Sequence, residues 1–181
     1  RGGAHLFEND NQGALQVSFE GLQRFPDSAR LHQVAGGIYL EMGDLPAAEE
    51  HLQKAIARDE DYLVHKAYNQ MMIVHLRNDR PREAAELGDR LVAHRKLYWQ
   101  GWNTFGASLL RIKAWPEAAQ VLNQALLLAP HSADAQCNRA LATYHLGRFG
   151  EAKRHWERCL ALDPGNTNAK KGLEDLGMNP G

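Results

Sequence analysis

The sequence is poor in cysteine. Its 181 residues include two, Cys137 and Cys159, which are too few for a disulfide framework and match no metal-ligand spacing. We therefore interpret both as free thiols. Cys159 is expected to be a small core residue and Cys137 a small residue that lines a surface.

Charge of one sign and long apolar runs are also missing. Lys and Arg total 21 against 22 for Asp and Glu, so the formal net charge is −1 and no overall field attracts nucleic acid or an anionic membrane. The longest apolar run, Ala125–Ala129, is far shorter than the roughly 20 residues that a membrane-spanning helix needs. We expect neither nucleic-acid binding nor membrane insertion.

Motifs of catalysis and of cofactor binding do not occur. The chain has neither Gly-x-Gly-x-x-Gly nor a P-loop, and Ser108 lies in Gly-Ala-Ser-Leu-Leu rather than in a nucleophile elbow. The nine histidines include no pair spaced as in His-Glu-x-x-His. Acid–base catalysis needs two groups held in a cleft, so the scattered carboxylates are interpreted as solvated helix faces. We predict no enzyme, no metal and no cofactor.

What the chain does contain is a pattern that repeats every 34 residues. Within residues 99–130, apolar side chains recur at helical spacing in two segments. A shift of 34 takes Ala118 forward to Ala152 and back to Ala84, and a step of 36 then reaches Ala48. The two extra residues fall in the acidic loop between those last two positions. Five units agree in phase, which predicts paired helices that bury their apolar faces against neighbouring pairs.

This pattern resembles the tetratricopeptide repeat, whose signature is W-x2-L-G-x2-Y, then A-x3-F, then P over 34 residues. The residues that carry the resemblance, unit by unit, are Gly36, Tyr39, Gly43, Ala48, Leu52 and Ala55; Trp102, Gly106, Ala118, Leu122, Ala125 and Pro130; and Ala140, Gly147, Phe149, Ala152, Trp156 and Pro164. The middle unit departs most, with Met72 at the glycine position, Gly88 at the large aromatic position and Lys96 at the proline position. The resemblance implies an all-α fold, a right-handed superhelical solenoid of antiparallel helix pairs.

The register divides the chain into segments. We expect a partial first repeat at 1–28, made of the tail of one helix and a second helix that starts at Asn9, and a capping helix at 167–177 before a tail at 178–181. The complete repeats are expected at 29–64, 65–98, 99–132 and 133–166. Because the array begins in mid-repeat, Leu6 and Phe7 would lack cover, which favours either self-association as a homodimer or contact with upstream sequence.

Turn chemistry coincides with the expected helix ends. Pro46, Pro81 and Pro116 each fall in the first turn of the second helix of a unit, where the missing N–H costs nothing. Asp44 and Asp79 stand just before two of these prolines and are candidate N-caps.

The resemblance also implies where a partner would bind. In this family the first helices line a concave face that holds a partner peptide or helix, so residues that recur once per repeat form ladders along it. Asn69 and Asn103, with Asn138 one residue off their ladder, are predicted to hold a peptide backbone, because a side-chain amide pairs with both C=O and N–H groups. The alternative is that they are ordinary polar residues on an exposed face.

Two further ladders have alternative interpretations. Lys66, Arg77 and Arg111 would form a positive strip that favours acidic residues in a partner, or they are simply solvated charges. The Lys, Asn and Arg set of the carboxylate-clamp subgroup is not recovered. An apolar ladder is either packing between adjacent helices, which we favour, or a strip that accepts an amphipathic helix; its members are Leu40, Ile73, Leu76, Leu110, Leu141 and Tyr144.

These observations predict a non-enzymatic protein–protein interaction module or adaptor that binds a partner peptide or helix. The alternative is a scaffolding or regulatory arm of a larger enzyme or of an envelope or secretion assembly, and RNA binding is disfavoured by the charge. The chain opens with Arg1 and has no signal-peptide pattern, so we interpret it as a piece of something longer. The cytoplasm is the default compartment, and an exported one stays open.

Overall fold

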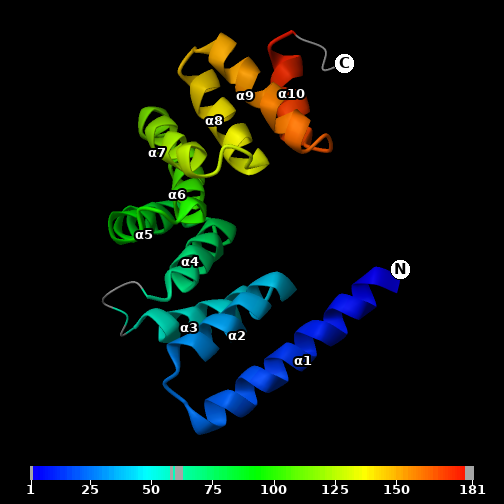
Figure 1. The fold of residues 1–181 in the computed structure, drawn as a ribbon, viewed down its shortest axis with the longest axis vertical. Coiled ribbons are helices and arrows are strands. Elements are labelled where there is room, and N and C mark those ends of the chain that lie inside the picture. The colour runs from blue at the N-terminus through cyan, green and yellow to red at the C-terminus, as the bar shows by residue number, and fades with distance from the viewer. Residues whose placement is uncertain (1, 58, 60–62, 178–181) are drawn as a thin grey trace. The chain divides into compact units, whose positions relative to one another are not determined.

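The computed structural model describes residues 2–57, 59 and 63–177, with side chains from residue 11 onward. All regular structure in this part of the chain is helical (Figure 1). The helices are α1 (Gly2–Arg24), α2 (Ala29–Met42), α3 (Leu45–Ile56), α4 (His65–Arg77), α5 (Pro81–His94), α6 (Trp99–Arg111), α7 (Trp115–Leu128), α8 (Ala133–His145), α9 (Phe149–Leu162) and α10 (Thr167–Asp175).

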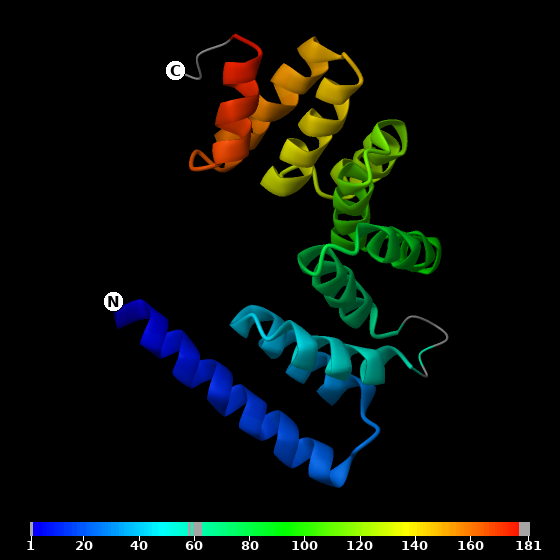
Figure 2. The ribbon, with the colours of Figure 1, turned by 180° about the vertical axis from the view of Figure 1, so that it is seen from behind.

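Consecutive helices pack as hairpins. Helices α2 and α3, α6 and α7, and α8 and α9 are in contact, and the second helix of each hairpin also packs on the helix that follows it. The first helices touch one another as well, α2 with α4, α6 with α8 and α8 with α10. Figures 1 and 2 show α8 and α9 side by side with α10 against them. The predicted all-α fold of stacked helix pairs is confirmed.

Small residues in the first helices let large ones in the second helices approach closely. A Cβ on Gly36 would lie 2.7 Å from Leu52 Cγ, and a Cβ on Gly106 would lie 2.5 Å from Leu122 Cγ. Both leucines are fully buried. The pattern of small residues facing large ones, which the repeat register implies, therefore sets the distance between the helices of each hairpin.

The helix starts agree with most of the turn chemistry. Asp44 accepts a hydrogen bond from the Ala47 N–H at 3.1 Å, and Asn166 caps α10 by accepting from the Ala169 N–H at 3.1 Å. Asp79 differs from the prediction, because it adopts a φ of 56° in the left-handed turn between α4 and α5. It occupies the turn position that Gly43 occupies between α2 and α3, where the chain reverses direction.

Helix α1 is continuous from Gly2 to Arg24, so the expected division into a helix tail and a second helix from Asn9 is wrong. This stretch contains no proline, the residue that opens the second helix in three of the repeats. Leu15 packs α1 on α2. Leu6 and Phe7 lie outside the residues whose side chains are described.

The chain divides into two compact units, Arg1–Leu87 and Gly88–Gly181. The division falls inside α5 at Gly88, which occupies the position of Leu52, Leu122 and Trp156 in the other repeats. Glycine supplies no side chain where those repeats place a large core residue. The repeat that departs most from the pattern, at residues 65–98, thus also contains the point at which the chain divides into its two compact units.

Cys137 of α8 and Cys159 of α9 form a disulfide, with their Cα atoms 5.5 Å apart. The prediction of two free thiols is therefore wrong. Their separation of 22 residues matches no known motif, but it places them at facing positions of one helical hairpin. Cys159 is nevertheless fully buried in the core with Trp156 and Leu173, as expected.

Candidate peptide-binding face

An amide pair joins the first helices of the last two repeats. Asn138 Nδ2 on α8 donates to Asn103 Oδ1 on α6 at 3.1 Å, and both side chains are half-buried. The described hydrogen bonds use neither Asn103 Nδ2 nor Asn138 Oδ1. This pair therefore presents one amide donor and one amide acceptor, which are the groups that match an extended peptide backbone.

The first unit contains the same arrangement at the equivalent positions. Gln33 Nε2 on α2 donates to Gln70 Oε1 on α4 at 3.0 Å. In each pair, the residue on the later helix is Gln70 or Asn138. It lies one residue beyond the position that corresponds, in the repeat register, to its partner on the earlier helix. Ladders drawn strictly by register miss these pairs, and the offset of Asn138 from its ladder was the signal that could have revealed them.

The remaining residues of the predicted face in the first unit have different environments. Lys66 is exposed, whereas Ile73 and Leu76 are half-buried, with Ile73 against the core. Asn69 is half-buried, and its Oδ1 is buried without a hydrogen-bond partner among the described residues. This acceptor is an unsatisfied polar group of the kind that a bound donor would complete.

A cavity of about 380 Å³ lies beside the amide pair of the second unit. Residues of α8, α9 and α10 line it. The lining residues are Cys137, Asn138, Leu141, Tyr144, His145, Trp156, Asn168, Lys171, Gly172 and Asp175. The sequence predicted only a capping helix at 167–177, and the contribution of α10 to a cavity was missed.

The apolar ladder separates into core and surface. Leu40 is 6% exposed and Leu110 is 7% exposed, so these side chains pack between helices and offer a partner almost no surface. Leu141 is 38% exposed and lines the cavity with Tyr144, whose ring lies 5.5 Å from that of Trp156. The cavity can therefore accept an apolar side chain.

Arg77 of the predicted positive strip has a structural role. Its Nη1 donates to the Leu40 carbonyl at 2.8 Å, near the end of α2, where that carbonyl also accepts from the Gly43 N–H at 3.3 Å. This bond ties the end of α4 to the end of α2. Arg111 lies at the end of α6 and is exposed.

A further contact recurs in all four repeats. In each, a side chain in the first helix donates to a backbone carbonyl of the loop before that helix. The bonds are His32 Nε2 to Pro26 O at 3.0 Å, Tyr68 Oη to Asp59 O at 2.6 Å, Trp102 Nε1 to Lys96 O at 2.8 Å and Gln136 Nε2 to Pro130 O at 3.0 Å. Four different residue types thus satisfy one constraint.

Comparison with known proteins agrees with this geometry. Family models described as tetratricopeptide repeat match residues 29–62 and 106–171. The chain belongs to the tetratricopeptide repeat family. Membership supports a role in protein–protein interaction or as a scaffold, and this family is generally non-catalytic.

A curated relative with tetratricopeptide repeats is much longer than this chain. The anaphase-promoting complex subunit Cut9 of Schizosaccharomyces pombe is 25% identical over 196 residues, which cover 99% of this chain and 28% of the relative. In the crystal structure of the Cut9–Hcn1 hetero-tetramer the similarity has a TM-score of 0.81 at 20% identity and covers 92% of this chain and 33% of that one. The chain thus spans about a quarter of the length of that curated relative.

Two other solved tetratricopeptide repeat structures are similar. YrrB, described as having an unusual peptide-binding site, has a TM-score of 0.72 at 17% identity, with 92% of this chain and 84% of that chain covered. The second such domain of human RPAP3, solved with an HSP70 peptide, has a TM-score of 0.58 at 25% identity, with coverage of 62% and 93%. These likenesses establish the fold.

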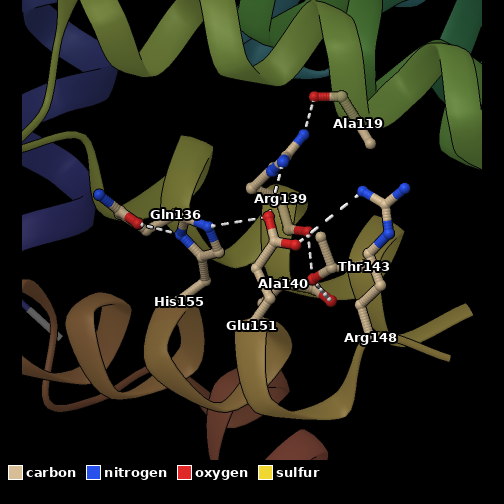
Figure 3. Close-up of polar contacts among 8 residues, drawn as sticks. All are labelled: Ala119, Gln136, Arg139, Ala140, Thr143, Arg148, Glu151 and His155. Carbon is tan, nitrogen blue, oxygen red and sulfur yellow. Dashed lines mark hydrogen bonds and ion pairs between the residues drawn. The ribbon is translucent and has the colours of Figure 1, made fainter. Parts of the chain in front are cut away.

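A polar network lies in the last tetratricopeptide repeat, apart from the cavity (Figure 3). Arg139 of α8 donates to the Ala119 carbonyl of α7 and to Glu151 Oε1 of α9, the latter at 2.6 Å. His155 Nδ1 lies 2.7 Å from Gln136 Oε1 and its Nε2 lies 3.8 Å from Glu151 Oε1. The network therefore ties three helices together.

The electrostatics of this network fit a structural role. Burial alone would raise the pKa of Glu151, but the hydrogen bond and charge of Arg139 hold it below its usual value. Burial lowers the pKa of His155, and the Arg139 charge lowers it further. Both shifts favour an ionised Glu151 beside a neutral His155, with the arginine charge already matched by the carboxylate.

Within the part of the chain with described side chains, no group of three or more His, Cys, Asp or Glu could hold a metal ion. None of the described helices is long and apolar enough to cross a membrane.

Proposed function

We propose that this chain is a non-enzymatic interaction module that binds an extended segment of a partner protein along the first helices of its repeats. In the second unit the binding face is formed by α6, α8 and α10. The observation that carries the proposal is the Asn103–Asn138 pair, because its unused donor and acceptor adjoin a cavity lined by Asn138 and able to take a side chain.

The chemistry of this face favours a peptide that is held by hydrogen bonds to its backbone and by one apolar side chain in the cavity. An extended peptide exposes alternating C=O and N–H groups, which Asn103 Nδ2 and Asn138 Oδ1 can satisfy without regard to sequence. Tyr144 and Trp156 would contact an apolar side chain of the peptide. Peptide binding by YrrB and by the RPAP3 domain supports this class of partner for the same fold.

Acidic residues in the partner are part of this proposal. Lys171 lines the cavity, and Lys66 and Arg111 are exposed at the predicted strip. Asp175 also lines the cavity, so the favourable charge is local and modest. Affinity for an acidic peptide should fall as salt is raised, and affinity that is insensitive to salt would remove this element of the proposal.

The test starts from peptides selected on the full chain from a random display library. Affinity is then measured by fluorescence anisotropy for the chain and for the double variant Asn103→Ala plus Asn138→Ala. Two lost neutral hydrogen bonds at about 1 kcal/mol each predict a loss of roughly 30-fold. Asn123→Ala, on the exposed surface of α7, is the matched control and should bind normally. An unchanged affinity in the double variant would refute this binding face.

A second function is favoured by the comparison with Cut9, a subunit of the anaphase-promoting complex. The match covers 28% of Cut9. In this alternative the chain is a scaffolding or regulatory arm of a larger enzyme or of an envelope or secretion assembly. Self-association through Leu6 and Phe7 as a homodimer belongs to the same proposal. Analytical ultracentrifugation of the chain tests it: a mass that stays monomeric over a hundredfold concentration range would exclude the homodimer.

A further inference from the structure

Two histidines meet at the joint between α1, α2 and α3. His32 Nδ1 and His51 Nδ1 lie 3.0 Å apart, and His32 Nε2 lies 3.0 Å from the Pro26 carbonyl. A carbonyl can only accept, so His32 Nε2 carries a proton and its Nδ1 in the neutral ring is an acceptor. His51 Nδ1 must then be the donor. The geometry therefore assigns the tautomer of both rings.

This pair connects α1 to the first complete hairpin. His32 is buried on α2 and bonds to the loop that joins α1 to α2. His51 on α3 contacts the Phe19 ring of α1 at 5.8 Å and stacks on the Tyr39 ring of α2 at 5.5 Å. The pair itself joins α2 to α3, but each ring also contacts α1 or the loop after it, so a ring displaced by repulsion would lose that contact.

The charges around His51 are few. Helix α1 presents the uncharged Phe19, and α2 presents His32 and the phenol of Tyr39. Helix α3 itself carries Glu50 and Lys54, which pair with each other at 2.6 Å. No carboxylate bonds to either imidazole, and Glu50, whose charge acts on both rings, is already paired with Lys54.

Protons added to this pair have unequal consequences. A proton on His51 Nε2 leaves both existing hydrogen bonds in place. When both imidazoles are cations, two N–H groups face each other across the 3.0 Å between the Nδ1 atoms. Two donors and two cations at that distance repel, so protonation of both rings breaks the contact.

The last repeat provides a natural comparison at the same positions. Gln136 stands for His32 and His155 for His51, and Gln136 bonds to the Pro130 carbonyl as His32 does to that of Pro26. The His155 contact to Gln136 Oε1 is 2.7 Å. A glutamine cannot take up a proton in this pH range, so this version keeps its bonds when His155 is protonated.

We propose that the His32–His51 pair is an acid-sensitive latch that fastens α1 to the first hairpin and releases it when both imidazoles are protonated. The released surface would include the contact of Leu15 with Ala35 and Ile38. The device is specific to the first unit, because the fourth repeat carries the glutamine version.

The direction of the pH effect follows from His51. Burial, together with the charges of His32 and Lys54, lowers the pKa of His51 from 6.5, and Glu50 only partly opposes this. A group whose folded pKa is depressed contributes stability that is present above the unfolded pKa and lost as pH falls below it. Release of α1 is therefore expected in acid, below pH 6.5, and not in base.

Hydrogen exchange of the full chain tests the latch. Protection of residues 11–28, corrected for intrinsic exchange rates, should fall about tenfold between roughly pH 7.5 and pH 5, while residues 149–162 change much less. His32→Gln installs the arrangement of the fourth repeat and should hold protection constant. Gln136→His is the reciprocal variant and should make the α7–α8 loop acid-sensitive. Equal losses in the chain and in His32→Gln, or no loss in either, would overturn the proposal.

A measurement on the unmodified chain covers the case in which His32→Gln fails to fold. Nitrogen-15 NMR of the histidine rings near pH 7.5 should show a protonated Nε2 on His32 and a protonated Nδ1 on His51. On acidification, the α1 signals should change only when both rings have become cations. A His32 ring protonated at Nδ1 at neutral pH contradicts the latch.

Discussion

Gly106 lies so close to Leu122 that a Cβ on the glycine would stand 2.5 Å from the leucine Cγ and Cδ2. Leu122 is fully buried in α7, so it has little freedom to withdraw. Gly106→Ala should therefore overpack the α6–α7 hairpin and lower the free energy of unfolding by about 1–3 kcal/mol. Urea denaturation measures this loss.

Gly150→Ala is the matched control for that substitution. Gly150 lies in α9, and a Cβ there would meet nothing within 4 Å. Alanine in an open helical position should leave stability unchanged or raise it by about 0.5–1 kcal/mol. Equal effects of the two substitutions would mean that close packing at Gly106 is not what limits its side chain.

The turn between the two helices of each repeat requires a left-handed residue. Gly43, Asp79, Lys113 and Gly147 stand at this position, with φ values of 82°, 56°, 63° and 73°. A non-glycine residue is strained there by roughly 1 kcal/mol. Lys113→Gly should stabilise the chain by about 0.5–1 kcal/mol, measured by urea denaturation.

The reverse substitution tests the same requirement. Gly43→Ala should destabilise the chain by about 1 kcal/mol, although a Cβ at Gly43 would contact nothing within 4 Å. If Gly43→Ala leaves the free energy of unfolding unchanged, the left-handed backbone conformation does not explain why glycine occupies this position.

The Cys137–Cys159 disulfide closes a loop of 22 residues between α8 and α9. Constraint of the unfolded chain by a loop of this length contributes about 3 kcal/mol. Reduction should therefore lower the thermal midpoint of the chain, and the double variant Cys137→Ser plus Cys159→Ser should not respond to reductant. Thiol titration of the unfolded, unreduced chain should find no free thiol, and two reactive thiols would show that the disulfide does not form.

Glu151→Gln isolates the ion pair of the last repeat. The Arg139 side chain is 13% exposed and donates to Glu151 at 2.6 Å, so the substitution leaves a nearly buried cation without its charge partner. The expected loss is about 1–3 kcal/mol in the free energy of unfolding. Glu157→Gln breaks the open Lys153–Glu157 pair at 3.7 Å and should cost less than about 0.5 kcal/mol. Equal losses of unfolding free energy in the two variants would mean that burial does not determine how much each ion pair contributes to stability.

Much of the fold could be predicted because the repeat pattern is local and recurs. The spacing of Gly36 and Leu52, and of Gly106 and Leu122, indicates the face on which each hairpin closes, and the prolines indicate where second helices begin. The predicted break in α1 failed because the repeat register was extended into a segment that has no proline to end the first helix.

The candidate face was predictable in part. Asn103 and Asn138 were named from the sequence, but their mutual hydrogen bond depends on an offset of one residue between neighbouring first helices. Packing was the favoured interpretation of the apolar ladder, and it holds for Leu110 but not for Leu141, which is 38% exposed. Register identifies which residues recur but not how far each projects past its neighbours.

The stack of tetratricopeptide helix pairs follows from the amino-acid sequence alone, because a 34-residue pattern of small and large residues leaves few other ways to bury its apolar faces. Which distant side chains meet depends on the folded arrangement. The Cys137–Cys159 disulfide, the bond from Arg77 to the Leu40 carbonyl and the His32–His51 contact each join separate helices. Such contacts depend on angstrom-scale offsets between helices, which no spacing along the chain records.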